Sequence, residues 1–170
     1  VLGIYNTKFI ANSAVNGGAM YINKAGDTND TETTSIVGKS LFEKNKADNG
    51  AGVYNAGEVT FENNAFLSNT AKVAGGAIYN TGTLTQKVAI FTNNKAVNGG
   101  ALYNAGTYTD EAIDGDKTTT ENVTKLFTKF ENNTATLGGA IYNVGTLTLK
   151  GTYFNGNYAI YGGTIYNAGK

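Results

Sequence analysis

Hydrophobic and polar positions recur along this chain with a period of about 24 residues. A phenylalanine is followed three positions later by asparagine, and after a short spacer come Gly-Gly-Ala, an aliphatic residue, tyrosine and asparagine. The phrase occurs six times, in segments 9–23, 42–57, 66–82, 91–106, 130–145 and 154–169. Such units bury their apolar faces only against their neighbours. The sequence therefore predicts a solenoid of six coils.

The coils are expected to consist of short strands. Glycine pairs and asparagines stand where a helix would have to run, which disfavours the helical and leucine-rich repeats that share this period. Three strands per coil are predicted, as in segments 140–142, 146–149 and 152–154, with turns at Gly and Asn. Because parallel crossovers strongly prefer one hand, we expect an all-β, right-handed, single-stranded parallel β-helix.

Repeated side chains should stack in columns, because equivalent residues of successive coils lie one strand spacing apart. The aliphatic position should point inward, together with Leu84, Leu147 and Leu149, and the tyrosine after it should point outward. The inward phenylalanines are Phe9, Phe42, Phe66, Phe91, Phe130 and Phe154. The outward tyrosines are Tyr21, Tyr54, Tyr79, Tyr103, Tyr142 and Tyr166.

The asparagine of the F-x-x-N motif should form a third column, at a corner of the coil. An amide carries donors and acceptors, so each asparagine can bond the backbone and its stacked neighbour. We interpret this column as structural. Its members are Asn12, Asn45, Asn69, Asn94, Asn133 and Asn157.

Two intervals between the phenylalanines are lengthened, to 33 and 39 residues instead of 24 or 25. The chain is therefore predicted to be one β-helix segment, 1–170, with insertions near 24–40 and 107–129. Both should lie between the Tyr-Asn corner and the next coil and leave the same edge. Loops on a rigid solenoid are frequent binding elements, although exposed loops also drift without a role. The acidic candidates are Asp27, Asp30, Glu32, Asp110, Glu111, Asp114 and Asp116.

Asp114 and Asp116 are the best calcium candidates, because calcium requires several oxygen ligands. The spacing of an EF-hand is absent, however, and ordinary solvated charge is the alternative interpretation. We expect no cofactor.

Composition restricts the possible partners. The chain has 13 cationic and 13 anionic side chains, and the cations are scattered, so no basic stripe would bind nucleic acid. No apolar run is long enough to cross a membrane as a helix, so we expect no membrane insertion by this segment. The chain begins within a strand-like segment and ends inside a repeat, which predicts a piece of a longer array.

Catalysis is not expected. The chain lacks His, Cys and Arg, and no carboxylate recurs on one strand face, although many parallel β-helices cleave acidic polysaccharides. Ice binding is a further minor alternative, because T-x-T recurs at 83–85, 107–109 and 146–148, with Glu58 and Thr60 at the matching place. Threonine is also simply a good exposed strand residue. The outward tyrosines offer rigid aromatic area to sugars or proteins, or serve packing alone.

The paired motifs F-x-x-N and G-G-A-aliphatic resemble the tandem motifs of the chlamydial polymorphic outer membrane proteins and related bacterial adhesin-like passengers. The resemblance covers nearly the whole chain, with small departures at Gly50-Ala51-Gly52, Thr164 and Ile22. It implies an autotransporter-like passenger displayed on the bacterial surface, with a translocator elsewhere in the full chain. It also implies adhesion to protein or glycan on host or neighbouring cells. The alternative is a purely structural stalk or spacer.

Overall fold

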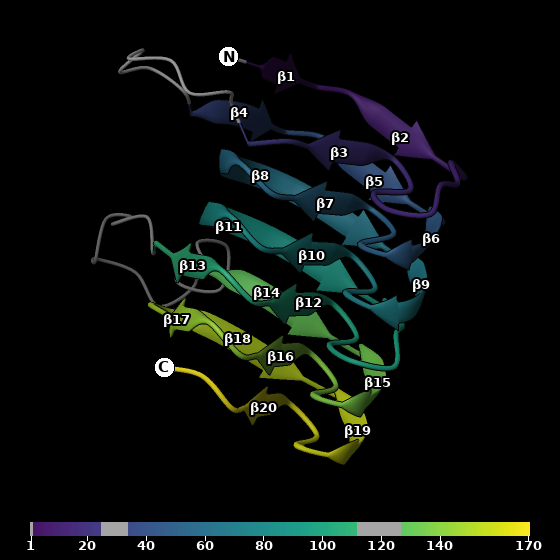
Figure 1. The fold of residues 1–170 in the computed structure, drawn as a ribbon, viewed down its shortest axis with the longest axis vertical. Coiled ribbons are helices and arrows are strands. Elements are labelled where there is room, and N and C mark those ends of the chain that lie inside the picture. The colour runs from purple at the N-terminus through teal and green to yellow at the C-terminus, as the bar shows by residue number, and fades with distance from the viewer. Residues whose placement is uncertain (1, 25–33, 112–126) are drawn as a thin grey trace, which may run out of the picture.

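The computed structural model describes residues 2–24, 34–111 and 127–170, which form strands and turns without a helix (Figure 1). Successive coils lie on one another in parallel register. The chain is a parallel β-helix, and its six-stranded sheet receives one strand from each coil. This confirms the fold predicted from the repeat. In these three described ranges, no helix is long and apolar enough to cross a membrane.

Each coil has four sides. The first contains β1 (Gly3–Tyr5), β4 (Ser35–Gly38), the first halves of β8 (Glu58–Leu67) and β11 (Thr83–Thr92), β13 (Thr107–Asp110) and β17 (Thr146–Thr148). The second contains β2 (Lys8–Ile10), β5 (Leu41–Glu43), the second halves of β8 and β11, β14 (Thr128–Glu131) and β18 (Thr152–Asn155). The third contains β6 (Lys46–Asn49), β9 (Thr70–Ala74), β15 (Thr134–Leu137) and β19 (Tyr158–Tyr161). The fourth contains β3 (Met20–Ile22), β7 (Val53–Asn55), β10 (Ile78–Asn80), β12 (Leu102–Asn104), β16 (Ile141–Asn143) and β20 (Ile165–Asn167).

The prediction of three strands per coil missed the third side. This side is formed by the spacer between F-x-x-N and G-G-A, and in two coils it consists only of isolated bridges, as at Ser13 and Lys95. Its interior is a small cluster of Ala47, Ala51, Ala71 and Ala96. The spacer letters differ from coil to coil except for an alanine two positions after each motif asparagine, and this repeated alanine was the available signal for the third side.

Left-handed backbone residues make three of the corners, with φ between 49° and 69°. The corner before each motif asparagine uses Ala11, Lys44, Ser68, Asn93, Asn132 and Gly156. The corner before the fourth side always uses the first glycine of the pair: Gly17, Gly50, Gly75, Gly99, Gly138 and Gly162. Glycine is required there because a Cβ on Gly99 would overlap the carbonyl oxygen of Leu102. The glycine pair thus sets the direction of the fourth side.

The interior is filled by columns of identical or similar side chains. The phenylalanine rings stack with centroids 4.6–5.2 Å apart and planes within 19° of parallel. The aliphatic column is in strict register through Met20, Val53, Ile78, Leu102, Ile141 and Ile165. Leu84 is fully buried, whereas Leu147 and Leu149 are partly buried against the same core. These columns supply the apolar burial that stabilises the coils.

The F-x-x-N asparagines form a continuous hydrogen-bonded column inside the wall. The side-chain Nδ2 of Asn94 donates to the carbonyl of Phe66 and to Oδ1 of Asn133, at 2.9 and 3.0 Å. Its own Oδ1 accepts from the backbone N and the Nδ2 of Asn69, both at 3.0 Å. The amide therefore uses its donors and acceptors fully, and it satisfies backbone groups that the corner would otherwise leave buried and unpaired.

A second asparagine column, which the sequence reasoning did not predict, lies at the Tyr-Asn corner. Each Nδ2 donates to Oδ1 of the next coil at 2.7–2.8 Å, through Asn55, Asn80, Asn104, Asn143 and Asn167. The same Nδ2 groups also donate to nearby carbonyls, as Asn80 does to Thr107. The repeated Y-N dipeptide was visible in the sequence and was the available signal.

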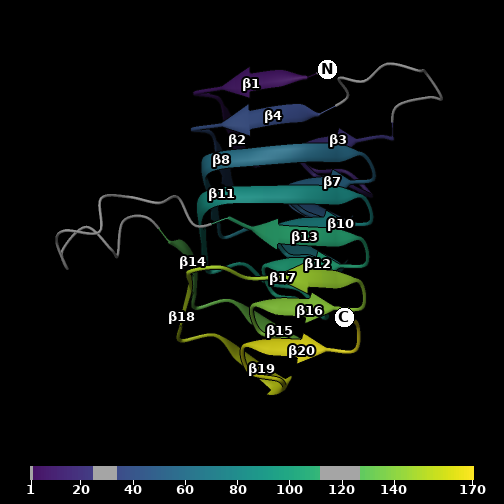
Figure 2. The same cartoon turned by 90° about the vertical axis from the view of Figure 1, so that its left-hand side faces the viewer.

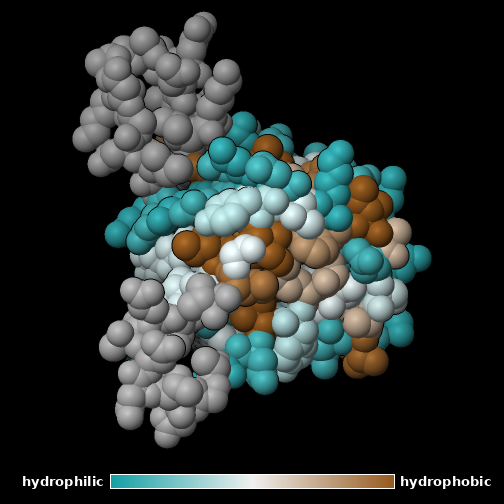
Figure 3. All heavy atoms as spheres, turned by 90° about the horizontal axis from the view of Figure 1, so that it is seen from above, coloured by the Kyte–Doolittle hydropathy of each residue, from teal (hydrophilic) through white to brown (hydrophobic). Residues whose placement is uncertain are grey.

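The end of the solenoid exposes part of this interior. Seen along the axis from the side of β1, a hydrophobic centre lies within a rim that is mostly hydrophilic (Figure 3). Leu2 is 40 % exposed, and Ile4 and Phe9 are only partly buried. Each coil therefore depends on the next one to cover its apolar face.

An inner member and an end member of the F-x-x-N asparagine column provide a matched test of the asparagine hydrogen bonds. Asn94→Ala should lower the free energy of unfolding by about 2–4 kcal/mol, because it leaves the backbone N–H of Asn69 and the carbonyl of Phe66 buried without a hydrogen-bond partner. Asn12→Ala, at an exposed coil, should cost well under half of that. Urea denaturation measures both, and equal effects would contradict a role for buried amide satisfaction.

The second glycine of the pair offers another comparison within the repeat. A Cβ on Gly100 would overlap the carbonyl of Gly139 in the next coil, whereas a Cβ on Gly163 would meet only Asn157 O, at 3.9 Å. We expect Gly100→Ala to destabilise the chain by about 3 kcal/mol and Gly163→Ala by less than about 1 kcal/mol. Thermal denaturation of the two variants measures both effects. Similar losses of stability would mean that the overlap with the next coil is not the cause of the destabilisation.

Candidate functional site

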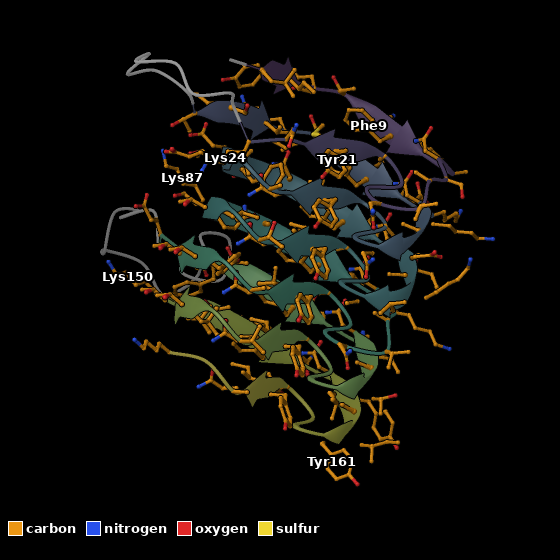
Figure 4. The ribbon with its side chains drawn as sticks, viewed as in Figure 1. Phe9, Tyr21, Lys24, Lys87, Lys150 and Tyr161 are labelled. Carbon is orange, nitrogen blue, oxygen red and sulfur yellow. The ribbon has the colours of Figure 1, made fainter. Side chains whose placement is uncertain are left out.

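The outward face of the fourth side carries an uninterrupted column of tyrosines. Strand alternation turns the aliphatic residue inward and the following tyrosine outward, and parallel register aligns the tyrosines of all six coils. Their ring centroids lie 4.6–5.1 Å apart with planes within 15° of parallel. Tyr21 heads this column in Figure 4, and it is 51 % exposed. We call these six residues the tyrosine face.

Stacking determines which parts of the tyrosine rings a partner can reach. Each inner ring is covered on both sides by its neighbours, so Tyr54, Tyr79, Tyr103 and Tyr142 are half-buried. What remains accessible is a row of ring edges and phenol hydroxyls repeating at the coil spacing. Such a row suits edge contacts and hydrogen bonds with an extended partner.

The tyrosine face also perturbs its own protonation. Burial raises the pKa of Tyr79 above its ordinary value, and the neighbouring Tyr103 and Tyr54 raise it further. The pKa of Tyr103 is raised mainly by burial, with an added contribution from Tyr142. Neutral phenols can stack closely, whereas adjacent phenolates would repel each other.

The threonine rows lie on a different face, the outer surface of the first side. Glu58, Thr83, Thr107 and Thr146 are in register and exposed, and Thr60, Thr85, Thr109 and Thr148 form a half-buried row beside them. The carboxylate of Glu58 breaks the first row, where it accepts a hydrogen bond from Thr34. The rows therefore exist as predicted from T-x-T, but their chemistry is not uniform.

The two insertions leave the coil at different corners, which corrects the expectation of a common edge. The first lies between β3 and β4, after the Tyr-Asn corner as predicted. The second lies one side later, between β13 and β14, so residues 107–110 belong to a strand. In Figure 2, the ends of β3 and β13 point to opposite sides of the solenoid. The repeated T-x-T pattern had already marked 107–109 as a strand.

The acidic candidates divide into three groups. Asp27, Asp30, Glu32, Asp114 and Asp116 lie outside the described residues. Glu111 is exposed at the end of β13. Asp110 was expected in a binding loop, but it is 1 % exposed and belongs to the core. That prediction was wrong because Asp110 continues the alternation of β13, which turns Tyr108 and Asp110 inward together.

Asp110 holds two threonine hydroxyls. Oγ1 of Thr128 donates to its Oδ1 at 2.7 Å, and Oγ1 of Thr152 donates to its Oδ2 at 2.5 Å. Burial raises the pKa of Asp110, and the hydrogen bonds from Thr152 and Thr128 oppose this shift. Burial also raises the pKa of Tyr108 well above its ordinary value, and the nearby Asp110 adds to it.

Among the described residues, no group of three or more His, Cys, Asp or Glu side chains is placed to hold a metal ion. A shallow groove of about 370 Å³ lies at the corner between the first and second sides, near Lys8 and Lys39. Its other lining residues are Asn6, Thr7, Ser40, Leu41, Asn63 and Ala65, so it contains no carboxylate.

Raised pKa values in the tyrosine face predict alkaline sensitivity. Because folding favours the protonated phenols of Tyr79 and Tyr103, stability is complete below pH ~10 and declines as the pH rises through and above that value. The variant Tyr79→Phe/Tyr103→Phe should weaken this decline. Unfolding across an alkaline pH series measures it, with Tyr153→Phe as the control outside the face. If stability declines with pH as steeply in the double variant as in the unaltered chain, the stacked phenols are not the cause of the alkaline sensitivity.

Three segments of the chain match a known repeat family. The model of the Chlamydia polymorphic membrane protein repeat matches residues 65–81, 89–105 and 127–144. Each match extends from the F-x-x-N strand on the second side to the Tyr-Asn corner after the fourth. No curated protein and no solved structure matches the chain. The matches confirm the resemblance inferred from the motifs: three segments of this β-helix match the Chlamydia polymorphic membrane protein repeat.

Proposed function

We propose that this chain is a non-catalytic adhesive passenger that binds protein or glycan on host or neighbouring cells. The polymorphic membrane protein repeat supports the coarser part of the proposal, a surface passenger of autotransporter type at the outer membrane or cell surface. Display on the extracellular side and adhesion are the further steps. A purely structural spacer is the competing function.

The tyrosine face is the observation that carries adhesion. A column that only packs the interior would point inward, but these tyrosines lie on the outer face of the wall. Aromatic side chains bind partners at low entropic cost, because they are large and have few rotatable bonds. Here the stacking also restricts the side-chain conformations of the tyrosines, so binding a partner costs little further conformational entropy.

The geometry favours a partner that extends along the solenoid axis. The ring centroids of the tyrosine face repeat at 4.6–5.1 Å, so the face offers one phenol group per coil along the axis. A glycan chain or an extended protein segment presents polar groups in series and can contact several of them at once. Contacts in series add avidity that one weak hydroxyl contact lacks.

Binding of the 170-residue chain to host cells and to a glycan panel tests this proposal. The variant Tyr54→Thr/Tyr79→Thr/Tyr103→Thr removes three rings from the face, and the matched Phe triple variant keeps the stack without its hydroxyls. We expect at least tenfold weaker binding with Thr and an intermediate loss with Phe. A third variant, with residues 25–33 and 112–126 replaced by short turns, should retain binding.

Each outcome separates the alternatives. Binding lost only in the turn variant would move adhesion from the tyrosine face to the insertions. No binding by the unaltered chain would contradict adhesion and favour the spacer. Circular dichroism of every variant verifies that the coils remain folded.

A further inference from the structure

Asp110 occupies a column that is otherwise mostly apolar. In-register pairing places it in line with Val37, Phe61 and Gln86 of the preceding coils. It is 1 % exposed, and no described Lys lies within ion-pair distance of it. An ionised carboxylate in this place would be desolvated without a compensating charge. The position therefore favours the neutral acid.

The hydrogen bonds of Asp110 join three strands. Asp110 ends β13, Thr128 begins β14, and Thr152 begins β18 in the next coil. The Asp110–Thr128 bond thus links the two residues that flank segment 111–127, and the Thr152 bond ties both to the following coil. The side chain acts as a clasp at the base of the second insertion.

Two buried polar atoms beside this clasp have no partner, namely Oε1 of Gln86 and the hydroxyl of Tyr108. The Nε2 of Gln86 donates to the carbonyls of Phe61 and Val88, at 3.1 and 3.2 Å. Those two acceptors fix the amide orientation, because an inverted amide would place oxygen against oxygen. Since Phe61 belongs to the preceding coil, Nε2 faces that coil, and the register neighbour of Gln86 on the other side is Asp110.

A buried acceptor without a donor requires an explanation. Gln86 and Asp110 are direct neighbours in the register, about 4.8 Å apart between their strands. The hydroxyl of a protonated carboxyl group supplies the donor that Oε1 lacks, and its oxygens still accept from the two threonines. One proton thus satisfies the orphan acceptor and removes the uncompensated charge.

We propose that Asp110 is held in the folded coil as a neutral carboxylic acid that donates to Gln86 and clasps Thr128 and Thr152, forming a proton-dependent lock at the base of the second insertion. The proposal is independent of adhesion. Tyr108 is the titratable group that faces Asp110 from β13 itself. On β11, β14 and β18, alternation turns Lys87, Lys129 and Tyr153 to the outer surface.

The direction of the pH effect follows from burial, which raises the pKa of Asp110 in the fold. A raised pKa means that the folded chain binds the proton more tightly than the unfolded chain. The contribution to stability is complete below pH ~4, the ordinary value of an aspartate, and is lost as the pH rises to the folded value. Across that window the unfolding constant should increase up to about tenfold per pH unit.

Asp110→Asn is the decisive variant, because the amide is an uncharged mimic of the acid that can still donate to Gln86. We expect the variant and the unaltered chain to unfold alike near pH 4 and the variant to become progressively the more stable as the pH rises. Glu111→Gln is the matched control, since it removes the adjacent exposed carboxylate and should leave the pH profile of the unaltered chain unchanged.

Carboxyl carbon NMR of the unaltered chain gives a second readout, which does not require the variant to fold. A titration of Asp110 above the ordinary aspartate range supports the lock, and a titration at or below that range overturns it. A loss of stability in Asp110→Asn at neutral pH would overturn it as well. Stabilisation by added calcium or sodium chloride in the unaltered chain but not in Asp110→Asn would also overturn it, in favour of a bound cation.

Discussion

The constraint on which this structure depends is that every side chain of a coil stacks on its counterpart in the next coil. Parallel register at the β spacing places each inward residue directly against the equivalent residue of the next coil. Phenylalanine therefore stacks on phenylalanine and amide on amide. The asparagine columns show the consequence for polar groups, because the acceptor that satisfies Asn69 exists only if the next coil presents Asn94. Repetition in the sequence is thus a physical requirement of the wall.

The same constraint explains how much the sequence predicted. The Phe, aliphatic, Tyr and Asn columns could be read from repeated letters, since identical letters at one period imply stacked positions. The third side was missed although alanine recurs two positions after every motif asparagine, as at Ala71, because one small inward residue per coil gives a weak apolar signal. Asp110 was misplaced because acidic neighbours made its segment resemble a loop. Aligning it with Gln86 and Phe61 would have placed it in the core.

Departures from a column carry the most information about a solenoid. The Phe and Asn columns change little, whereas the column of Val37, Phe61, Gln86 and Asp110 changes from apolar to polar where the second insertion interrupts the coil. Polar residues there are costly unless they are paired. The hydrogen bonds of Asp110 reach across the interruption to Thr128 and into the next coil. Asp110 therefore belongs with the insertion, since its side chain reconnects the two strands that the insertion separates.

The outer surface is free of these demands, which makes a repeated outward residue significant. Other outward positions vary, as the threonine row does at Glu58, but tyrosine stands in every coil of the fourth side. Ring stacking contributes some stability, by about 0.5–1.5 kcal/mol per aromatic pair. The interior columns already determine the register, however, so the fold alone does not require tyrosine there. The stacked rings also form a continuous rigid strip whose hydroxyl edge faces outward. A surface of this kind is expected where a passenger has to contact an extended partner over several coils.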